Sequence, residues 1–460
     1  MPPPPQHPVS EGRRSNMSES NSAPQLPPQK SAFEKFLSLF SDIRPGEGGT
    51  VALLVLNAFI MLGLYYILKP VREGLILSGF GAVVKSYSSA AMALLLVFIV
   101  PAYGAFAARV NRVWLISGMT LFFISNLVVF ALLLQSGVNI GIAYYIWVGI
   151  FNLMIVSQFW SFANDIYSED QGKRLFPVVG IGASAGAVAG AALTGSVFEQ
   201  MSNSQLLLLA SALLGVFIAL TVWVNKKETA GSTKEAAKAE QPLGKEGGFH
   251  LVMKNRYLLL VAFHILILNL VNTVGEFVLG SLFVQEAIQQ VGDGDAFRAA
   301  RGEYIRTMYG NFFGWVNLAG LLVQSFVVSR LIKHLGVRRS LFIGPLVSLG
   351  TYGVSAISPI LSIVRVMKIA ENSNDYSTNN TVRAALFLPT SRDVKYKAKA
   401  AADTFFARTG DALQAAVVFI GTRLSFGIPA FAAVNVVIIG VWLAVVAGIA
   451  REHKKLTEEA

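Results

Sequence analysis

The chain has 460 residues, of which 53% are hydrophobic and only 14% are charged, and its formal net charge is +11. Soluble domains carry roughly a quarter charged residues, so this composition excludes an ordinary soluble protein and indicates a membrane protein. The chain contains no cysteine, which excludes disulfides and thiolate metal sites, and its five histidines are scattered. We therefore predict that it uses no metal and no cofactor.

Two segments precede the first apolar stretch. Residues 1–30 are rich in Pro and Ser and lack the apolar region of a signal peptide, so we expect a disordered tail. Residues 31–48 are expected to contain an amphipathic helix that lies in the membrane interface. Its apolar face would consist of Phe33, Phe36, Leu37 and Phe40.

Apolar stretches of about 20 residues, long enough to cross the hydrocarbon core, recur along the rest of the chain. They predict twelve membrane-spanning helices, with eleven or thirteen as the alternatives. Because none of them alternates polar and apolar residues as a barrel strand does, the predicted fold class is an all-α polytopic membrane protein. The predicted spans are 49–69, 84–108, 113–135, 140–163, 175–199, 205–225, 256–284, 304–329, 339–358, 359–386, 399–422 and 428–450.

The basic residues indicate how these spans are oriented. If the N-terminus is cytoplasmic, the cytoplasmic segments hold 27 of the 38 Lys and Arg residues. This excess predicts that both termini face the cytoplasm, and we place the protein in the cell (inner) membrane. A basic chain also suits a nucleic-acid binder, but here the charge lies on short loops between apolar spans. We therefore predict the lipid bilayer as its surroundings and no nucleic-acid partner.

The longest polar stretch between spans is 226–255, and it divides the spans six and six. We expect an N-terminal half at 49–225, a cytoplasmic linker at 226–255, a C-terminal half at 256–450 and a cytoplasmic tail at 451–460. This layout resembles the major facilitator superfamily, in which two six-helix halves rock about a central site. Members of that superfamily are commonly monomers, so the resemblance implies a monomer.

Charged residues within a membrane span usually mark a water-filled pathway or a substrate site. In the segment YYILKPVREGLIL, apolar residues resume directly after Lys69, Arg72 and Glu73. We expect the first helix to continue past Pro70 and to hold these charges inside the protein, with an external interfacial loop as the alternative.

A polar stripe runs along the tenth span. Arg365, Lys368, Glu371 and Asp375 recur there at intervals of three or four residues, which places them on one helical face. Part of these charges are expected to be structural ion pairs, because an unpaired buried charge is costly. In spans one and ten together the bases outnumber the acids. This surplus predicts a cavity for an anion with phosphate or carboxylate groups.

A family resemblance rests on the segment KIAENSNDYSTNNTVRAALFLPTSRDVKYKAKAAADTFFARTGDAL and on two shorter ones, ILKPVREGLIL and FWSFANDIYSEDQGKRLFPVVGIGASAGA. These segments resemble the nucleotide (ATP/ADP) translocases, the major-facilitator-type exchangers of plastids and intracellular bacteria. The matching positions are Tyr376, Ser377, Thr381, Leu386 to Pro389, Lys395, Lys397, Lys399 to Ala401, Asp403, Arg408 and Gly410.

The resemblance implies exchange of ATP and ADP, or of related nucleotides, by alternating access, with Lys69, Arg72, Lys399 and Asp403 as candidates for phosphate binding or gating. No phosphate loop of the Walker type occurs, so ATP hydrolysis is not indicated and we predict a transporter, not an enzyme. The predicted substrate-binding residues are Lys69, Arg72, Glu73, Arg365, Lys368 and Lys399. The predicted gating or coupling residues are Glu276, Glu371, Asp375, Asp403 and Arg408.

The chain also departs from the family pattern. The family carries an acidic residue in span four and another in an NLVE-type element of span seven. Here no acid occurs from Gly141 to Asn164, and the second element ends in Asn272, with Glu276 one turn later as a candidate substitute. These departures leave open a carrier of another organic or phosphorylated anion, with proton coupling through Glu276 or Asp403 as an option. A membrane scaffold or receptor is the third alternative.

Overall fold

The computed structural model describes residues 30–38, 42–107, 109–110, 112–229, 248–390, 394 and 398–458. These residues are almost entirely helical, and no β-strand occurs among them. The predicted disordered tail, apart from residue 30, and most of the predicted linker (230–247) lie outside the described residues. The side chains of the predicted interfacial apolar face lie outside them as well.

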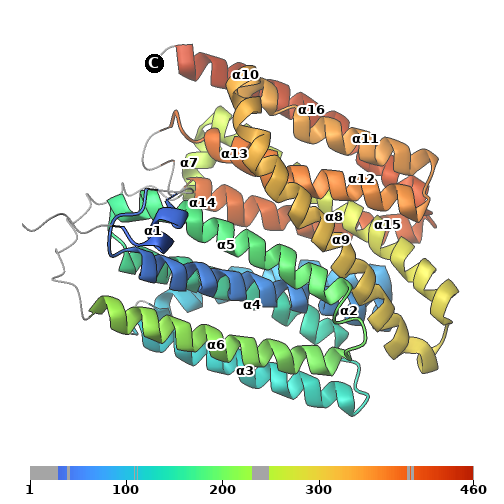
Figure 1. The fold of residues 1–460 in the computed structure, drawn as a ribbon. Coiled ribbons are helices and arrows are strands. Elements are labelled where there is room, and N and C mark those ends of the chain that lie inside the picture. The colour runs from blue at the N-terminus through green and yellow to red at the C-terminus, as the bar shows by residue number, and fades with distance from the viewer. Residues whose placement is uncertain are drawn as a thin grey trace, which may run out of the picture.

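The long helices run side by side as an elongated bundle, with the first half of the chain along one side and the second half along the other (Figure 1). The first half contains α1 (Ala32–Leu37), α2 (Gly48–Ala107), α3 (Arg112–Gln135), α4 (Gly141–Ile166), α5 (Glu169–Gly195) and α6 (Asn203–Thr229). The second half contains α7 (Gly248–Lys254), α8 (Arg256–Val291), η1 (Asp295–Phe297), α9 (Arg298–Phe326), α10 (Val328–Ser340), α11 (Ile343–Ile357), α12 (Leu361–Asn374), η2 (Asp375–Asn379), α13 (Asn380–Ala385), α14 (Lys399–Ala401), η4 (Ala402–Phe406), α15 (Ala407–Arg423) and α16 (Ile428–Glu458). We call α2–α6 the N-terminal bundle and α8–α16 the C-terminal bundle.

Helix α2 contains both of the first two predicted spans. Its helical structure continues through Pro70 and carries the charged residues that follow into the protein interior, as the sequence predicts. The alternative, an external interfacial loop, is wrong, because Glu73 is only 1% exposed and belongs to the packed interior. The break between the two spans is Gly81 instead, whose φ of 77° is a left-handed conformation that favours glycine.

Spans ten and eleven are interrupted helices. In each of them a short π-helical turn separates two α-helical pieces, η2 between α12 and α13, and η4 between α14 and α15. A π-helical turn shifts the side chains that follow it around the helix axis, and such turns are frequent at functional sites. The predicted stripe of Arg365, Lys368, Glu371 and Asp375 ends at the first residue of η2, so the turn changes the direction of the side chains that follow the stripe.

Seven helices in the described part of the chain are long and apolar enough to cross a membrane, and the bent pair of 295–326 with 328–340 is an eighth candidate. The remaining predicted spans do not meet the same test. Helix α11 has only 15 residues, and α12 and α15 are short and carry charges. The count of twelve therefore stays a prediction.

Three hydrophobic clusters form the core. The first is built from residues between Ile43 and Val224 and the second from residues between Val252 and Ile449, so each lies within one bundle. The third combines residues of α2, α4 and α5 with residues of α8, α9 and α15. This shared cluster packs the two bundles against each other.

The two bundles are sealed together at the end where α5 meets α6. Arg306 of α9 is fully buried and donates hydrogen bonds into the connection between those helices. The acceptors are the carbonyl oxygens of Phe198 (3.3 Å), Glu199 (2.9 Å) and Met201 (2.6 Å) and the side chain of Asn203 (3.0 Å). Close backbone contact continues beside it, because a Cβ atom on Gly195 would lie 2.5 Å from the backbone nitrogen of Asn311.

Candidate functional site

A polar cavity of about 210 Å³ lies where the two bundles meet. Its wall is formed by α2 and α4 of the N-terminal bundle and by α8, α9, α12, η2 and α15 of the C-terminal bundle. Four bases and three acids line it, so its formal charge is positive. These residues are Lys69, Arg72, Lys85 and Arg408 with Glu73, Glu276 and Asp411.

The N-terminal side of the cavity is organised around Glu73. Its carboxylate accepts from Arg72 Nη2 at 2.5 Å and lies 2.6 Å from Lys85 Nζ, and all three residues belong to α2. The Arg72 guanidinium also lies over the ring of Tyr145, 4.6 Å from its centroid. Two cations therefore share one buried carboxylate, which leaves this wall of the cavity positive.

Lys69 lies one turn before Arg72 and has a different environment. Its Nζ is 3.5 Å from the hydroxyl of Tyr376 and 3.8 Å from the ring centroid of Phe313. Among the described residues no carboxylate oxygen lies within 4.0 Å of it. Aromatic faces attract cations but carry no net charge, so Lys69 is available for an anion.

The C-terminal side of the cavity carries the other acids. Glu276 of α8 accepts a hydrogen bond from Asn372 Nδ2 at 3.2 Å and lies 3.9 Å from Lys85 Nζ across the cavity. Asp411 of α15 pairs with Arg408 at 3.0 Å. The ion pair between Lys85 and Glu276 therefore connects the two bundles through the cavity.

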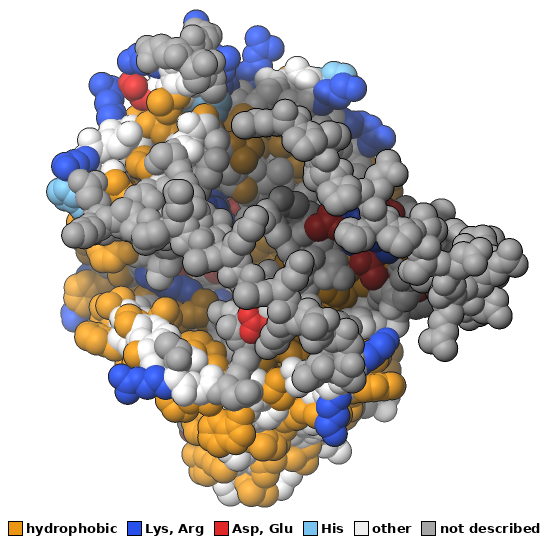
Figure 2. Space-filling view, turned by 90° about the vertical axis from the view of Figure 1, so that its left-hand side faces the viewer, with side chains coloured by type: hydrophobic (Ala, Val, Ile, Leu, Met, Phe, Trp, Pro, Cys, Tyr) orange, Lys and Arg blue, Asp and Glu red, His pale blue; other side chains and the backbone are white. Residues whose placement is uncertain are grey.

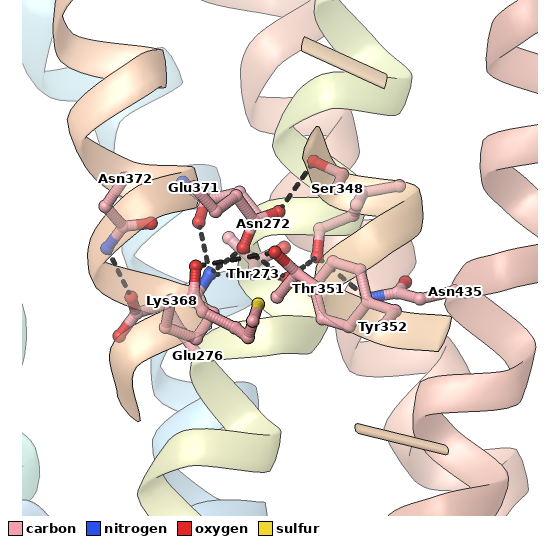
Figure 3. A network of polar contacts seen from close by, with 12 residues as sticks. Asn272, Thr273, Glu276, Ser348, Thr351, Tyr352, Lys368, Glu371, Asn372 and Asn435 are labelled. Atoms are coloured by element: carbon pink, nitrogen blue, oxygen red, sulfur yellow. Dashed lines mark hydrogen bonds and ion pairs between the residues drawn. The ribbon is translucent and has the colours of Figure 1, made fainter. Parts of the chain in front are cut away.

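A second charged network lies behind the cavity wall (Figure 3). Lys368 and Glu371 of α12 pair at 2.7 Å, and Lys368 Nζ also donates to Asn272 Oδ1 at 3.0 Å. Glu371 accepts further hydrogen bonds from Ser348 at 2.8 Å and from Tyr352 at 2.9 Å. Lys368 is fully buried and Glu371 only 5% exposed, and neither lines the cavity. The network is saturated and holds α8, α11 and α12 together.

The other predicted site residues lie apart from the cavity. Lys399 and Asp403 pair at 2.7 Å, and Arg383 Nε lies 3.7 Å from the same carboxylate. Arg365 and Asp375 are partly exposed and do not line the cavity either. Five predicted site residues therefore line the cavity together, Lys69, Arg72, Glu73, Glu276 and Arg408, and six do not, Arg365, Lys368, Glu371, Asp375, Lys399 and Asp403.

Other residues of the cavity were not predicted as site residues, among them Lys85 and three aromatic residues. Lys85 is 7% exposed and belongs to the predicted second span. Its sequence signal was a single cation inside an apolar stretch, a feature that usually marks function. The aromatic residues Tyr145 and Phe313 gave no such signal, because aromatic side chains are frequent throughout these spans, and Tyr376 was indicated only as a position that matches the family motif.

The family model of the TLC ATP/ADP transporters matches residues 142–453, which is more than half of the chain. This chain belongs to the TLC ATP/ADP transporter family. Membership confirms the family resemblance that the sequence motifs predict. It also establishes a multi-pass membrane transporter, in agreement with the apolar helices of the structure.

Curated proteins similar to this chain are named ADP,ATP carriers, and their sequence identity to it is low. ADP,ATP carrier protein 1 of Chlamydia pneumoniae is 22% identical over 336 residues, which cover 64% of this chain and 63% of that carrier. ADP,ATP carrier protein 1 of Rickettsia conorii is 22% identical, over 67% of each chain. The chloroplastic ADP,ATP carrier protein 1 of Arabidopsis thaliana is 23% identical, over 69% of this chain and 54% of that protein. The chain thus spans about half to two thirds of the length of these relatives.

Solved structures of transporters share the fold. The nucleoside transporter NupG superposes with a TM-score of 0.61 at 12% identity, over 89% of this chain and 99% of that one. A bacterial homologue of the iron transporter ferroportin, in an inward-facing state, gives a TM-score of 0.60 at 12% identity, over 87% and 98%. At such low identity the likeness concerns the fold alone. The predicted fold class, all-α, polytopic and major-facilitator-like, is confirmed.

Proposed function

We propose that this protein exchanges ATP and ADP, or related nucleotides, across a membrane by alternating access. The observation that carries the proposal is the positive wall of the cavity, formed by Lys69, Arg72 and Lys85 within a chain of the TLC ATP/ADP transporter family. The names of its curated relatives, which are ADP,ATP carriers, support the same substrate class.

The cavity offers groups for both parts of a nucleotide. The planar guanidinium of Arg72 suits two oxygens of one phosphate, and the ammonium of Lys69 suits a third as a point charge. The rings of Tyr145, Phe313 and Tyr376 provide faces on which a base can stack. Glu73 then acts as a positioning residue, because it holds Arg72 and Lys85 side by side.

Binding requires the bundles to separate. The cavity volume of about 210 Å³ lies below the roughly 300–1,000 Å³ of pockets that enclose drug-sized ligands. In our proposal the two bundles rock about the cavity and open it alternately to either side. Glu276 and Arg408 come from the C-terminal bundle, and during this motion Glu276 would change its contact with Lys85 of α2, whereas Arg408 would move relative to α2 across the cavity. We assign them the coupling role.

The proposed orientation places both termini in the cytoplasm of a cell (inner) membrane. Helix α1 and the end of α16 lie at the same end of the bundle (Figure 1). Exposed Lys and Arg side chains surround this end in Figure 2, in keeping with the excess of positive charge expected on the cytoplasmic side. The protein would act there as a carrier without enzymatic activity.

Counterflow in proteoliposomes tests the proposal. Vesicles that contain the purified protein and are preloaded with ADP should take up labelled ATP, and vesicles preloaded with buffer should not. Arg72→Ala should reduce this uptake strongly, since it removes the planar phosphate ligand. The matched control is Arg256→Ala, which removes an arginine that is 80% exposed and far from the cavity lining.

The outcomes separate the candidate functions. Uptake of ATP that depends on internal ADP and on Arg72 supports nucleotide exchange. Uptake of another phosphorylated or organic anion with no nucleotide uptake would instead identify a carrier for that anion, and dependence on a pH gradient would identify proton coupling. Binding and transport of neither class by folded protein would contradict a transport function.

A further inference from the structure

Lys69 differs from every other cation that lines the cavity. The other three each lie within 3.0 Å of a carboxylate oxygen. Within the described part of the chain, the polar and cation–π contacts of Lys69 are with the hydroxyl of Tyr376 and with aromatic rings, with the centroid of Phe313 at 3.8 Å and that of Tyr66 at 5.3 Å. The bases that line the cavity exceed the acids by one positive charge. Lys69 is the lining cation without a carboxylate partner among the described residues, so this excess charge lies on its ammonium.

The position of Lys69 makes this charge sensitive to the movement of the bundles. Lys69 belongs to α2 of the N-terminal bundle, whereas Phe313 and Tyr376 belong to α9 and η2 of the C-terminal bundle. Its ammonium therefore lies at the seam between the bundles. In alternating access the cavity must pass through a state that is closed at both ends, and in that state Lys69 is removed from bulk water.

Closure has different consequences for an empty and a loaded cavity. An ammonium that loses its water without gaining a counter-charge is strongly destabilised, and aromatic faces compensate for this only in part. A bound phosphate supplies the missing negative charge and hydrogen-bond acceptors. Closure does not destabilise the paired cations in this way, because each of them keeps its carboxylate partner in the closed state.

We propose that Lys69 is the residue that makes exchange obligatory. Its unpaired charge prevents the empty protein from switching between the state open to one side of the membrane and the state open to the other side. The inference rests on the proposed exchange of nucleotides and adds the cause of the exchange. Arg72, Lys85 and Arg408 contribute to anion binding, whereas Lys69 decides whether the protein returns empty. Loss of its charge should convert an exchanger into a protein that also releases substrate without a counter-substrate.

The first measurement compares two efflux rates from proteoliposomes loaded with labelled ATP. For the wild type, efflux into buffer with ADP should exceed efflux into nucleotide-free buffer about tenfold or more, since each tenfold corresponds to only 1.36 kcal/mol of barrier. In Lys69→Gln and Lys69→Met the ratio should fall close to one. Lys69→Arg keeps the charge and should keep the high ratio, and so should Arg256→Ala, which removes an exposed arginine outside the cavity lining. An unchanged ratio in both neutral variants would overturn the inference.

The second measurement does not depend on nucleotide transport. The chain has no cysteine, so Ser89→Cys introduces a single thiol into the cavity. With Lys69 present and no substrate, a membrane-impermeant thiol reagent should label it from one side of the membrane only. With Lys69→Gln, labelling should occur from both sides, even if nucleotide exchange itself proves to be wrong. Labelling that stays one-sided in folded Lys69→Gln and Lys69→Met would contradict the inference.

Discussion

Lys69 and Lys368 are two lysines inside the same bundle of helices, and their surroundings are opposite. Lys368 is fully buried and donates to Glu371, Asn272 and Tyr352, so each of its three protons has an acceptor. Lys69 borders the cavity and has no carboxylate partner among the described residues. A saturated buried cation holds helices together, whereas an unsaturated one at a cavity can bind a ligand.

The region around Lys368 and the region around Lys69 also differ in how they respond to movement of the bundles. The network around Lys368 connects three helices of one bundle, so it can stay intact while the bundles move relative to each other. The cavity around Lys69 is formed by both bundles and changes whenever they move. The first region is therefore expected to determine stability and the second to determine transport.

The largest effect is expected for Glu371→Gln. This substitution leaves the ammonium of Lys368 buried without its counter-charge, and breaking a buried pair in this way costs about 3–5 kcal/mol. Thermal unfolding of the purified protein in detergent measures the loss. The double variant Lys368→Gln with Glu371→Gln removes both charges and should recover most of the stability and retain nucleotide uptake. A stable Glu371→Gln protein that does not transport would place this pair in the transport site and contradict the comparison.

A smaller effect is expected at Arg306, whose two terminal guanidinium nitrogens donate to three backbone carbonyls and to the side chain of Asn203, whereas its Nε has no hydrogen-bond partner among the described residues. Arg306→Met leaves the acceptors in the connection between α5 and α6 unsatisfied, at a cost of about 1–3 kcal/mol. Because these bonds join the two bundles, the loss should favour opening at that end. Labelling of the Ser89→Cys thiol from that side should become at least about tenfold faster.

The control for Arg306 is Arg298→Gln, at the same end of the molecule. Arg298 is 35% exposed, pairs with Asp295 of its own bundle at 3.6 Å, and donates one long hydrogen bond of 3.5 Å to the carbonyl oxygen of Gly137 across the seam. Its replacement should change the labelling rate little. If Arg306→Met lowers thermal stability but leaves the labelling rate unchanged, Arg306 stabilises the packing at that end without controlling its opening.

Much of the fold follows from local sequence features. Apolar stretches of membrane-spanning length determined the helices of the N-terminal bundle to within a few residues, because each of them must cover the hydrocarbon core with apolar side chains. The span listed as 49–69 ended too early, because its limit followed the apolar residues, whereas the helix continues past Pro70, as expected from the apolar residues that follow Glu73, and breaks at Gly81. The interruptions at η2 and η4 were not predictable, because a π-helical turn has no distinct composition.

The site was predictable only in part, because periodicity does not reveal the partner of a side chain. Lys69 and Lys368 both stand three residues before another charged residue, as Lys69 with Arg72 and Lys368 with Glu371. The spacing is the same, but in the first case both residues are cations and in the second case they neutralise each other. Partners from other helices, such as Asn272 for Lys368, are far away in the sequence. They become neighbours only in the fold, so the spacing of residues within one helix cannot predict them.

The smallest effect concerns a carboxylate outside the membrane-spanning helices. Glu34 of α1 accepts hydrogen bonds from the backbone nitrogens of Ser31 (2.8 Å), Gly46 (2.8 Å) and Gly48 (3.3 Å), and so ties α1 to the start of α2. These hydrogen bonds, first that from Ser31, lower the pKa of Glu34 below its ordinary value of 4.5. Because the folded-state pKa is depressed, the stabilisation is complete above pH 4.5 and is lost as the pH falls through the folded-state pKa.

Glu34→Gln should therefore lower the melting temperature at neutral pH, and the difference from the wild type should shrink as the pH falls below 4.5. The matched control is Asp295→Asn, a carboxylate that is 97% exposed, whose replacement should leave the melting temperature nearly unchanged. If the difference stays constant down to about pH 3, the destabilisation by Glu34→Gln arises from altered packing and not from loss of the carboxylate charge. The predicted pH dependence would instead group Glu34 with Lys368, as a buried charge stabilised by several hydrogen bonds.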